Sequence, residues 1–216
     1  HMNIVNSFDR IKQEIKNNEI QYNTEIIAVS KTFPLEHIKP LVDHGHRHFG
    51  ENKVQEAEKK WSELKKSMID LKLHMIGRLQ SNKVKKAVEL FDYIHSLDNE
   101  KLANELSKRQ KEKGKRLGYF IQINLGSEEQ KGGIEETELK PFYDFCVQKL
   151  NLSILGLMAI PPNDNKPENH FKKISELNKQ FNFQQLSIGM SSDYLLAVNY
   201  GASFVRIGSA IFGSRS

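Results

Sequence analysis

The segment of residues 26–52, IIAVSKTFPLEHIKPLVDHGHRHFGEN, contains one complete strand–helix–strand unit. Its first residues, Ile26–Val29, form a short apolar and β-branched run that predicts a buried strand. Apolar residues then recur at helical spacing between Leu35 and Val42, and Gly45 marks the end of that helix. A second strand candidate follows at Arg47–Phe49. Two strands joined by a helix predict parallel pairing through a right-handed crossover.

The same unit recurs along the whole chain. Eight strand–helix units in 216 residues predict an α/β protein with a single (β/α)₈ barrel of the TIM type. An extra amphipathic helix, with Ile4, Phe8, Ile11 and Ile15 on one face, precedes the first strand. An open doubly wound sheet is the alternative that the periodicity leaves open. The predicted strands are Ile26–Val29, Arg47–Phe49, Leu73–Ile76, Tyr93–Ser96, Tyr119–Ile123, Leu155–Ala159, Gln185–Ile188 and Phe204–Ile207.

The composition is that of a soluble globular protein, with 38% hydrophobic and 27% charged residues. No change in composition divides the chain, so we expect one domain over residues 1–216, with His1 and Met2 left over from expression. No apolar run is long enough to span a bilayer, and we expect no membrane partner. The single cysteine, Cys146, excludes an internal disulfide. We therefore expect a cytoplasmic protein, and a monomer.

The net charge of +5 raises the question of a nucleic-acid partner. The densest basic stretch, Lys108–Arg116, lies at the end of a predicted helix, where the helix dipole favours cations. No aromatic residues interleave with these cations to stack on bases. We therefore interpret the stretch as a solvated helix end and expect no nucleic-acid partner.

Two neighbouring loops have the composition of a phosphate-binding site. Sites in such barrels lie at the carboxyl ends of the strands, and the loops after strands seven and eight commonly bind phosphate. These loops are Gly189–Asp193 and Arg206–Ser209; their glycines allow close backbone approach, and Ser191, Ser192 and Ser209 add hydroxyl groups. Either loop alone would be interpreted as helix capping with a turn glycine. Both together favour a phosphate site.

Lys31 and Arg206 are the charged residues that the strand pattern singles out. Lys31 directly follows the first strand, so it points into the predicted barrel mouth, where lost hydration would lower its pKa and allow the neutral amine to attack a carbonyl. An exposed loop lysine is the equally open alternative. Arg206 lies inside the last strand and needs an acceptor if it points inward. A pyridine nitrogen or a barrel carboxylate would each serve.

Six motifs occur in order along the chain: Ala28-Val29-Ser30-Lys31-Thr32, Phe49-Gly50-Glu51-Asn52, His74-Met75-Ile76-Gly77-Arg78-Leu79-Gln80-Ser81-Asn82-Lys83, Gly156-Leu157-Met158-Ala159-Ile160, Gly189-Met190-Ser191-Ser192-Asp193 and Val205-Arg206-Ile207-Gly208. Together they resemble the motifs of the YggS/PROSC family of pyridoxal phosphate homeostasis proteins, and the resemblance covers essentially the whole chain.

The resemblance implies a fold similar to the N-terminal domain of alanine racemase, with pyridoxal phosphate (PLP) as cofactor. By the same resemblance, Lys31 would hold the cofactor as a Schiff base and Arg206 would face the pyridine nitrogen. The phosphate would be bound by Ser191, Ser192, Gly208 and Ser209, and the ring pocket would be lined by Asn52, His74 and Met158.

The same residues predict a carrier or regulator of PLP, not a catalyst. A pyridine that faces an arginine withdraws electrons less than a protonated one does, and racemisation needs a second acid or base for which we expect no room after Gly213. PLP-dependent apo-enzymes are the expected recipients. A weak amino acid racemase that uses Lys31 is the alternative, and an RNA- or protein-binding module is the third. Lys83 and Lys131 also follow strands, near the pocket entrance or on the solvated surface. We expect no catalytic residue and no metal ligand.

Overall fold

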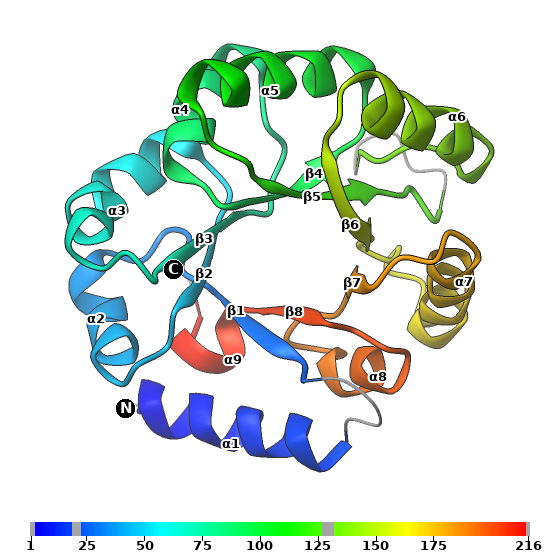
Figure 1. Ribbon diagram of the computed structural model, residues 1–216. Helices are drawn as coiled ribbons and strands as arrows, with labels where there is room; N and C mark the ends of the chain where they lie inside the picture. The colour runs from blue at the N-terminus through cyan, green and yellow to red at the C-terminus, as the bar shows by residue number, and fades with distance from the viewer. Residues whose placement is uncertain (1–2, 19–22, 127–131, 215–216) are drawn as a thin grey trace.

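The computed structural model describes residues 3–18, 23–126 and 132–214, and in it eight parallel strands close into a barrel (Figure 1). The strands follow one another around the barrel in chain order, and the last pairs with the first, Ile27 beside Arg206. The predicted (β/α)₈ barrel is confirmed, and the open doubly wound sheet is excluded. The strands are β1 (Glu25–Val29), β2 (His48–Glu51), β3 (Lys72–Met75), β4 (Tyr93–Leu97), β5 (Gly118–Gln122), β6 (Ser153–Met158), β7 (Gln185–Ser187) and β8 (Phe204–Ile207).

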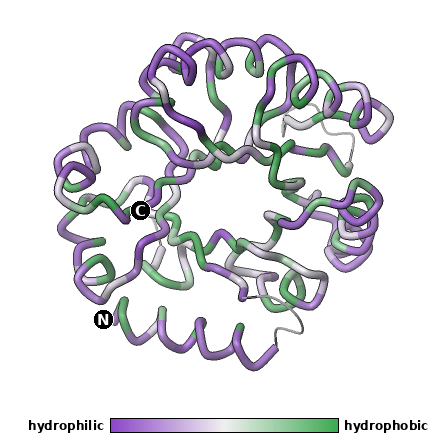
Figure 2. The backbone as a smooth tube through the Cα atoms, in the orientation of Figure 1, coloured by the Kyte–Doolittle hydropathy of each residue, from purple (hydrophilic) through white to green (hydrophobic). Residues whose placement is uncertain are grey.

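The helices form a ring around the barrel, and their apolar positions alternate with hydrophilic ones along the chain (Figures 1 and 2). They are α1 (Ile4–Asn18), α2 (Leu35–Asp43), α3 (Val54–Ser67), α4 (Val84–Leu90), α5 (Glu100–Lys113), α6 (Leu139–Asp144), α7 (Pro167–Gln180), α8 (Tyr194–Asn199) and α9 (Ser209–Phe212). Short helical turns are η1 (Ser81–Lys83), η3 (Glu136–Glu138) and η4 (Phe145–Lys149). None of the helices in the described ranges is long and apolar enough to cross a membrane.

The predicted extra helix is α1, which packs against α2, α8 and α9 outside the ring of strands (Figure 1). Its buried residues are Phe8, Ile11 and Ile15, three of the four that the apolar pattern named. Burial of these three large apolar side chains holds α1 against the barrel, since each contributes roughly 1.5–3 kcal/mol.

The barrel interior is filled by side chains from alternate strand positions. Ile27, Phe120, Met158 and Phe204 form a separate apolar cluster there, while the apolar residues at the intervening strand positions belong to the larger cluster shared with the helices. Because side chains alternate along a strand, the same parity that places Ile27 inside directs Lys31 toward the mouth at the carboxyl end of β1.

Candidate functional site

The mouth of the barrel brings Lys31 and the two predicted phosphate loops to the same end of the strands. Lys31 is half-buried and lies two residues beyond the end of β1. Thr32 follows it with φ of 69°, a left-handed conformation that reverses the chain toward α2. The β1–β8 pairing places this turn on the strand next to Arg206.

Arg206 forms the floor of this mouth. Its side chain is only 3% exposed, and its Nη1 donates to Ser187 Oγ at 2.6 Å while its Nη2 donates to the Ala159 carbonyl at 3.0 Å. Neither partner is a carboxylate, so the ion pair left open by the sequence is absent from the described contacts. Burial lowers the pKa of Arg206 to about 10, which leaves the guanidinium charged at neutral pH. A buried cation with neutral partners favours a ligand atom that accepts hydrogen bonds.

The two loops predicted to bind phosphate are joined to each other and to this floor. The Arg206 backbone N–H donates to the Gly189 carbonyl at 2.9 Å, and the Ala210 N–H donates to Ser191 Oγ at 3.3 Å. Gly189 has φ of 101°, and a Cβ there would lie 2.6 Å from the Ala197 Cβ. Only glycine fits this position, so the backbone of the loop is held close to α8.

The remaining predicted residues divide into two groups. Ser192 and Ser209 are exposed, Ser191 is half-buried and Gly208 is buried, all at the mouth. Asn52 is half-buried and lines a neighbouring cavity of about 400 Å³ together with Lys83. Lys131 and the pair His1 and Met2 lie outside the described residues.

His74 and Met158 lie inside the barrel. Both are fully buried: Met158 belongs to the apolar cluster inside the barrel, and His74 is hydrogen-bonded to His48 and His95. Contact with a cofactor ring stays a prediction for each of them.

A cavity of about 630 Å³ opens beside this mouth, over the carboxyl ends of β3, β4 and β5. Its volume is in the range of small-molecule sites. Its polar side chains are those of Arg78, Gln80, Ser81, Ser96, Asp98, Asn99, Lys101 and Gln122.

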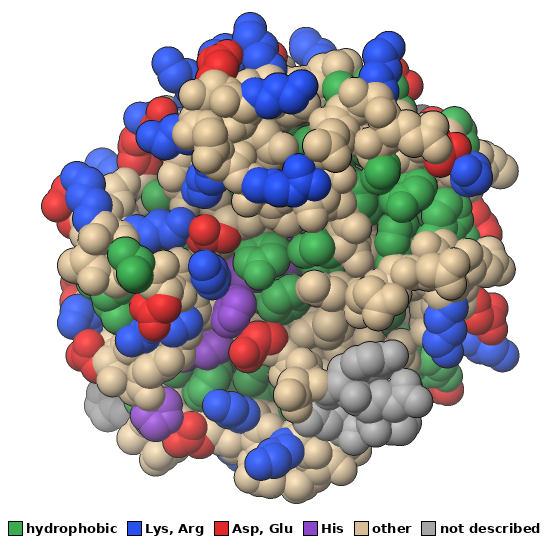
Figure 3. Space-filling view, viewed as in Figure 1, with side chains coloured by type: hydrophobic (Ala, Val, Ile, Leu, Met, Phe, Trp, Pro, Cys, Tyr) green, Lys and Arg blue, Asp and Glu red, His purple; other side chains and the backbone are tan. Residues whose placement is uncertain are grey.

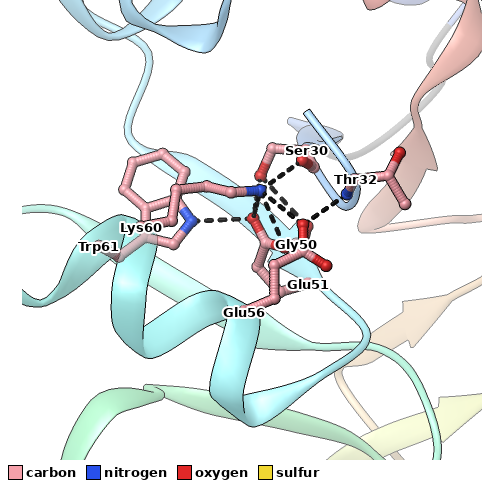
Figure 4. Close-up of polar contacts among 7 residues, drawn as sticks. All are labelled: Ser30, Thr32, Gly50, Glu51, Glu56, Lys60 and Trp61. Atoms are coloured by element: carbon pink, nitrogen blue, oxygen red, sulfur yellow. Dashed lines mark hydrogen bonds and ion pairs between the residues drawn. The ribbon is translucent and has the colours of Figure 1, made fainter. Parts of the chain in front are cut away.

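A buried ionic cluster that the sequence analysis missed supports the Lys31 turn from outside the barrel (Figure 4). The Glu51 carboxylate is fully buried at the end of β2 and accepts hydrogen bonds from Ser30 Oγ at 2.5 Å and from Trp61 Nε1 at 2.8 Å. Lys60 Nζ lies 3.0 Å from the same carboxylate and donates to the Ser30 carbonyl at 2.7 Å. The residue directly before Lys31 is therefore fixed through both its side chain and its backbone.

The same cluster also fixes the residue after Lys31. The Glu56 carboxylate, itself 3.0 Å from Lys60 Nζ, accepts the Thr32 backbone N–H at 2.5 Å (Figure 4). Burial raises the pKa of the Glu51 carboxyl, while the Lys60 ammonium and the hydroxyl and indole donors oppose that rise. Glu51 is part of a quoted sequence motif, but only the fold shows that α3 supplies its partners.

Comparison with known proteins gives a consistent result. Residues 5–216 match the family model described as the alanine racemase N-terminal domain. The pyridoxal phosphate homeostasis protein of Aquifex aeolicus is 40% identical over 200 residues, which cover 88% of this chain and 87% of the relative. The protein of the same name from Haemophilus influenzae is 37% identical over 230 residues, which cover 100% of this chain and 97% of the relative.

Solved structures agree with the sequence comparison. PipY of Synechococcus elongatus, solved with PLP bound, has a TM-score of 0.88 and 33% identity, covering 98% of this chain and 100% of its own. Alanine racemase from E. faecalis has a TM-score of 0.72 at 17% identity, and the match covers 59% of that longer chain. This second likeness shows a shared fold.

Proposed function

The chain belongs to the family of pyridoxal phosphate homeostasis proteins, which share the barrel of the alanine racemase N-terminal domain, and from that premise we propose that it binds PLP at the barrel mouth with Lys31 as the covalent anchor. The observation that carries the proposal is Arg206, a buried guanidinium with neutral partners, whose backbone is bonded to a glycine-serine loop. The half-buried Lys31 follows the adjacent strand.

The chemistry of the donor set fits PLP in three respects. A primary amine at the mouth, Lys31, matches an aldehyde; a buried cationic donor, Arg206, matches a pyridine nitrogen; and the joined loops match a phosphate. The close approach of backbone at Gly189, where a Cβ would collide with Ala197, supports the phosphate assignment. We propose that Ser191, Ser192, Gly208 and Ser209 bind the phosphate and that Asn52 lies at the ring edge.

When bound, PLP supplies an aldehyde that condenses reversibly with an amine and loses water. The chain's own residues would position the Lys31 amine and bind the rest of the cofactor. The ionic cluster of Ser30, Glu51 and Lys60 holds the turn that carries the Lys31 amine. Arg206 donates a hydrogen bond and keeps its proton, since the pKa of the guanidinium, about 10, remains above neutral pH. We propose that His74 and Met158, both inside the barrel, line the ring pocket.

We propose that the protein carries PLP and does not use it to catalyse a reaction. The names of the relatives support this role. The Arg206 guanidinium also supports this role. A guanidinium can only donate a hydrogen bond, so the pyridine nitrogen would stay unprotonated and would stabilise a carbanion poorly. Release would follow from hydrolysis or from transfer to the amine of a recipient, including a PLP-dependent apo-enzyme. A weak amino acid racemase remains the second candidate.

The test is to add PLP to the purified protein, record the visible spectrum, reduce with borohydride and map the modified peptide. We expect a yellow protein with the label on the peptide that contains Lys31. Label spread over surface lysines, or a colourless protein, would contradict the proposed site. Racemase, decarboxylase or transaminase turnover that disappears in Lys31→Ala would favour the enzyme over the carrier.

Removing the two hydroxyls of the phosphate loop together, in Ser191→Ala/Ser192→Ala, is expected to weaken PLP retention. Hydrogen bonds to a charged group contribute about 1.5–3 kcal/mol each, so the two together correspond to at least roughly a hundred-fold in affinity. Equilibrium dialysis of PLP would measure the change. Ser67→Ala removes an exposed hydroxyl at the far end of α3 and serves as the control. Equal affinity in the double variant and the control would remove both side chains from the phosphate assignment.

A further inference from the structure

A continuous line of hydrogen bonds runs through the barrel beneath Arg206. From Arg206 Nη1 it passes to Ser187 Oγ at 2.6 Å, and from Ser187 Oγ to His95 Nδ1 at 2.8 Å. It continues from His95 Nε2 to His74 Nδ1 at 2.9 Å and from His74 Nε2 to His48 Nδ1 at 2.9 Å. We call His48, His74 and His95 the histidine column. They come from the adjacent strands β2, β3 and β4, and Ser187 comes from β7 across the barrel.

The column ends at the solvent, at the end of the barrel opposite the mouth. His74 and His95 are fully buried, whereas the His48 side chain is 19% exposed and its Nε2 lies 3.9 Å from the half-exposed Glu25 carboxylate. Figure 3 shows histidine side chains at the centre of the barrel end that faces the viewer, beside acidic and basic side chains. The column therefore runs from a partly exposed histidine beside the Glu25 carboxylate to the buried guanidinium of Arg206.

The two buried histidines of the column, His74 and His95, are neutral at neutral pH. Burial lowers the pKa of His74 and of His95 well below the usual value, and the Arg206 cation adds to this effect at His95. A neutral imidazole has one N–H donor and one acceptor nitrogen. His74 and His95 must therefore each donate on one side and accept on the other.

At the open end, burial again lowers the pKa of the imidazole. The His48 side chain faces Glu25 and Asp92, which oppose the lowering, and Lys72, which adds to it. The neighbouring His46, whose pKa burial lowers to about 3, brings no charge at neutral pH.

The direction of the hydrogen bonds follows from the two ends. Arg206 can only donate, so Ser187 Oγ accepts from it and its own hydrogen goes to His95 Nδ1. His95 and His74 then each donate from Nε2, so His48 accepts at Nδ1 and carries its hydrogen on Nε2, which lies 3.9 Å from the Glu25 carboxylate. The opposite direction would aim a His48 lone pair at the carboxylate. It would also leave the Ser187 hydrogen without an acceptor among the described contacts.

We propose that His48, His74 and His95 are positioning residues for the cofactor site: the column holds the Ser187 hydroxyl toward His95, and the oxygen turned to Arg206 then fixes the guanidinium in one orientation. The inference rests on the proposed function for its consequence, because a fixed Arg206 is what would hold the pyridine nitrogen. The column itself is a property of the chain without cofactor.

The first arm of the test therefore uses the protein without PLP. Nitrogen-15 NMR of the imidazole rings should show the Nε2–H tautomer at all three histidines, with no titration of His74 or His95 between about pH 6 and pH 8. An Nδ1–H tautomer at His95, or a titrating signal from either buried ring, overturns the column. This result stands whether or not the protein binds PLP.

The second arm compares two substitutions of one ring. His95→Phe removes both nitrogens and keeps the stacking on Phe120, whose ring centre lies 4.5 Å away. His95→Asn keeps an acceptor at the Nδ1 position. We expect PLP to dissociate roughly ten- to a hundred-fold faster from His95→Phe, with most of the loss restored in His95→Asn. His44→Phe, at a surface histidine paired with Asp9, is the matched control.

The outcomes separate the column from the proposed function. If PLP dissociates equally fast from His95→Phe and His95→Asn, and both lose the same stability, His95 only stabilises the fold. That result overturns the positioning role. Absence of PLP binding in the unsubstituted protein contradicts the proposed function, and the tautomers then decide the column alone. If the His95 variants do not fold, His48→Leu at the exposed end replaces them. Because the Arg206 end alone sets the direction of donation, His74 and His95 should keep their Nε2–H tautomers in that variant, and an Nδ1–H tautomer at either ring contradicts the proposal.

Discussion

Lys31→Ala is expected to abolish both the visible band and the borohydride-stable label and to leave the barrel folded. Lys31 is half-buried in a turn at the mouth, so its truncation removes the proposed anchor without opening a cavity in the core. Substitutions of this kind usually change stability by less than about 0.5 kcal/mol. We expect PLP affinity to fall at least roughly a hundred-fold, which corresponds to about 2.7 kcal/mol.

The measurement combines PLP titration followed by absorption with peptide mapping after reduction. Lys83→Ala is the matched control, because Lys83 is also half-buried and lies in the neighbouring cavity with Asn52. We expect that control to keep the label on the Lys31 peptide. Retained affinity in Lys31→Ala, or a label that moves to Lys83 at full yield, would show that Lys31 is not the anchor.

The architecture could be predicted from the sequence because the repeated unit is local. Each strand is a short apolar run and each helix an amphipathic segment, and the observed strand ends differ from the predicted ones by at most two residues. Parallel pairing with right-handed crossovers then leaves few topologies. Arg206 could be anticipated for the same reason, since a cation inside an apolar strand must face the barrel interior or an edge.

The histidine column could not be predicted, because it depends on strand register. His48, His74 and His95 are separated by 26 and 21 residues, and each lies in a predicted strand. The sequence assigns them to strands but does not give the offset between neighbouring strands. The pairing of Gly50 with His74 and of His74 with Tyr93 sets that offset and brings the three rings into contact. The place of His74 in the ring pocket, which the family resemblance implies, stays a prediction.

The ionic cluster around Glu51 was missed for a different reason. A glutamate at the end of a strand has the composition of a solvated loop, and charged residues are almost never fully buried unless they are paired. Its partner Lys60 is one of several lysines on α3 and has no distinguishing sequence feature. Only the packing of α3 on β2 shows that Lys60 is 6% exposed and faces the carboxylate.

That burial leads to the largest expected loss of stability. Glu51→Ala leaves the Lys60 ammonium and the donors of Ser30 and Trp61 without the fully buried carboxylate that they contact. Removing one partner of a buried ion pair costs about 3–5 kcal/mol, because the remaining charge is left uncompensated in the interior. The free energy of unfolding in urea would measure the loss. Glu63→Ala, in an ion pair on α3 whose glutamate is 90% exposed, should cost less than about 1 kcal/mol.

Two further variants show which part of the loss of stability comes from the unpaired Lys60 ammonium. Glu51→Gln keeps acceptors for the hydroxyl and the indole, so we expect a smaller loss of about 1–3 kcal/mol. The double variant Glu51→Leu/Lys60→Met removes both charges and should recover most of the stability that Glu51→Ala loses. It should not recover PLP affinity, because Ser30 and the turn that carries Lys31 remain without their support. A double variant as unstable as Glu51→Ala would mean that packing, and not the unpaired ammonium, makes Glu51 necessary.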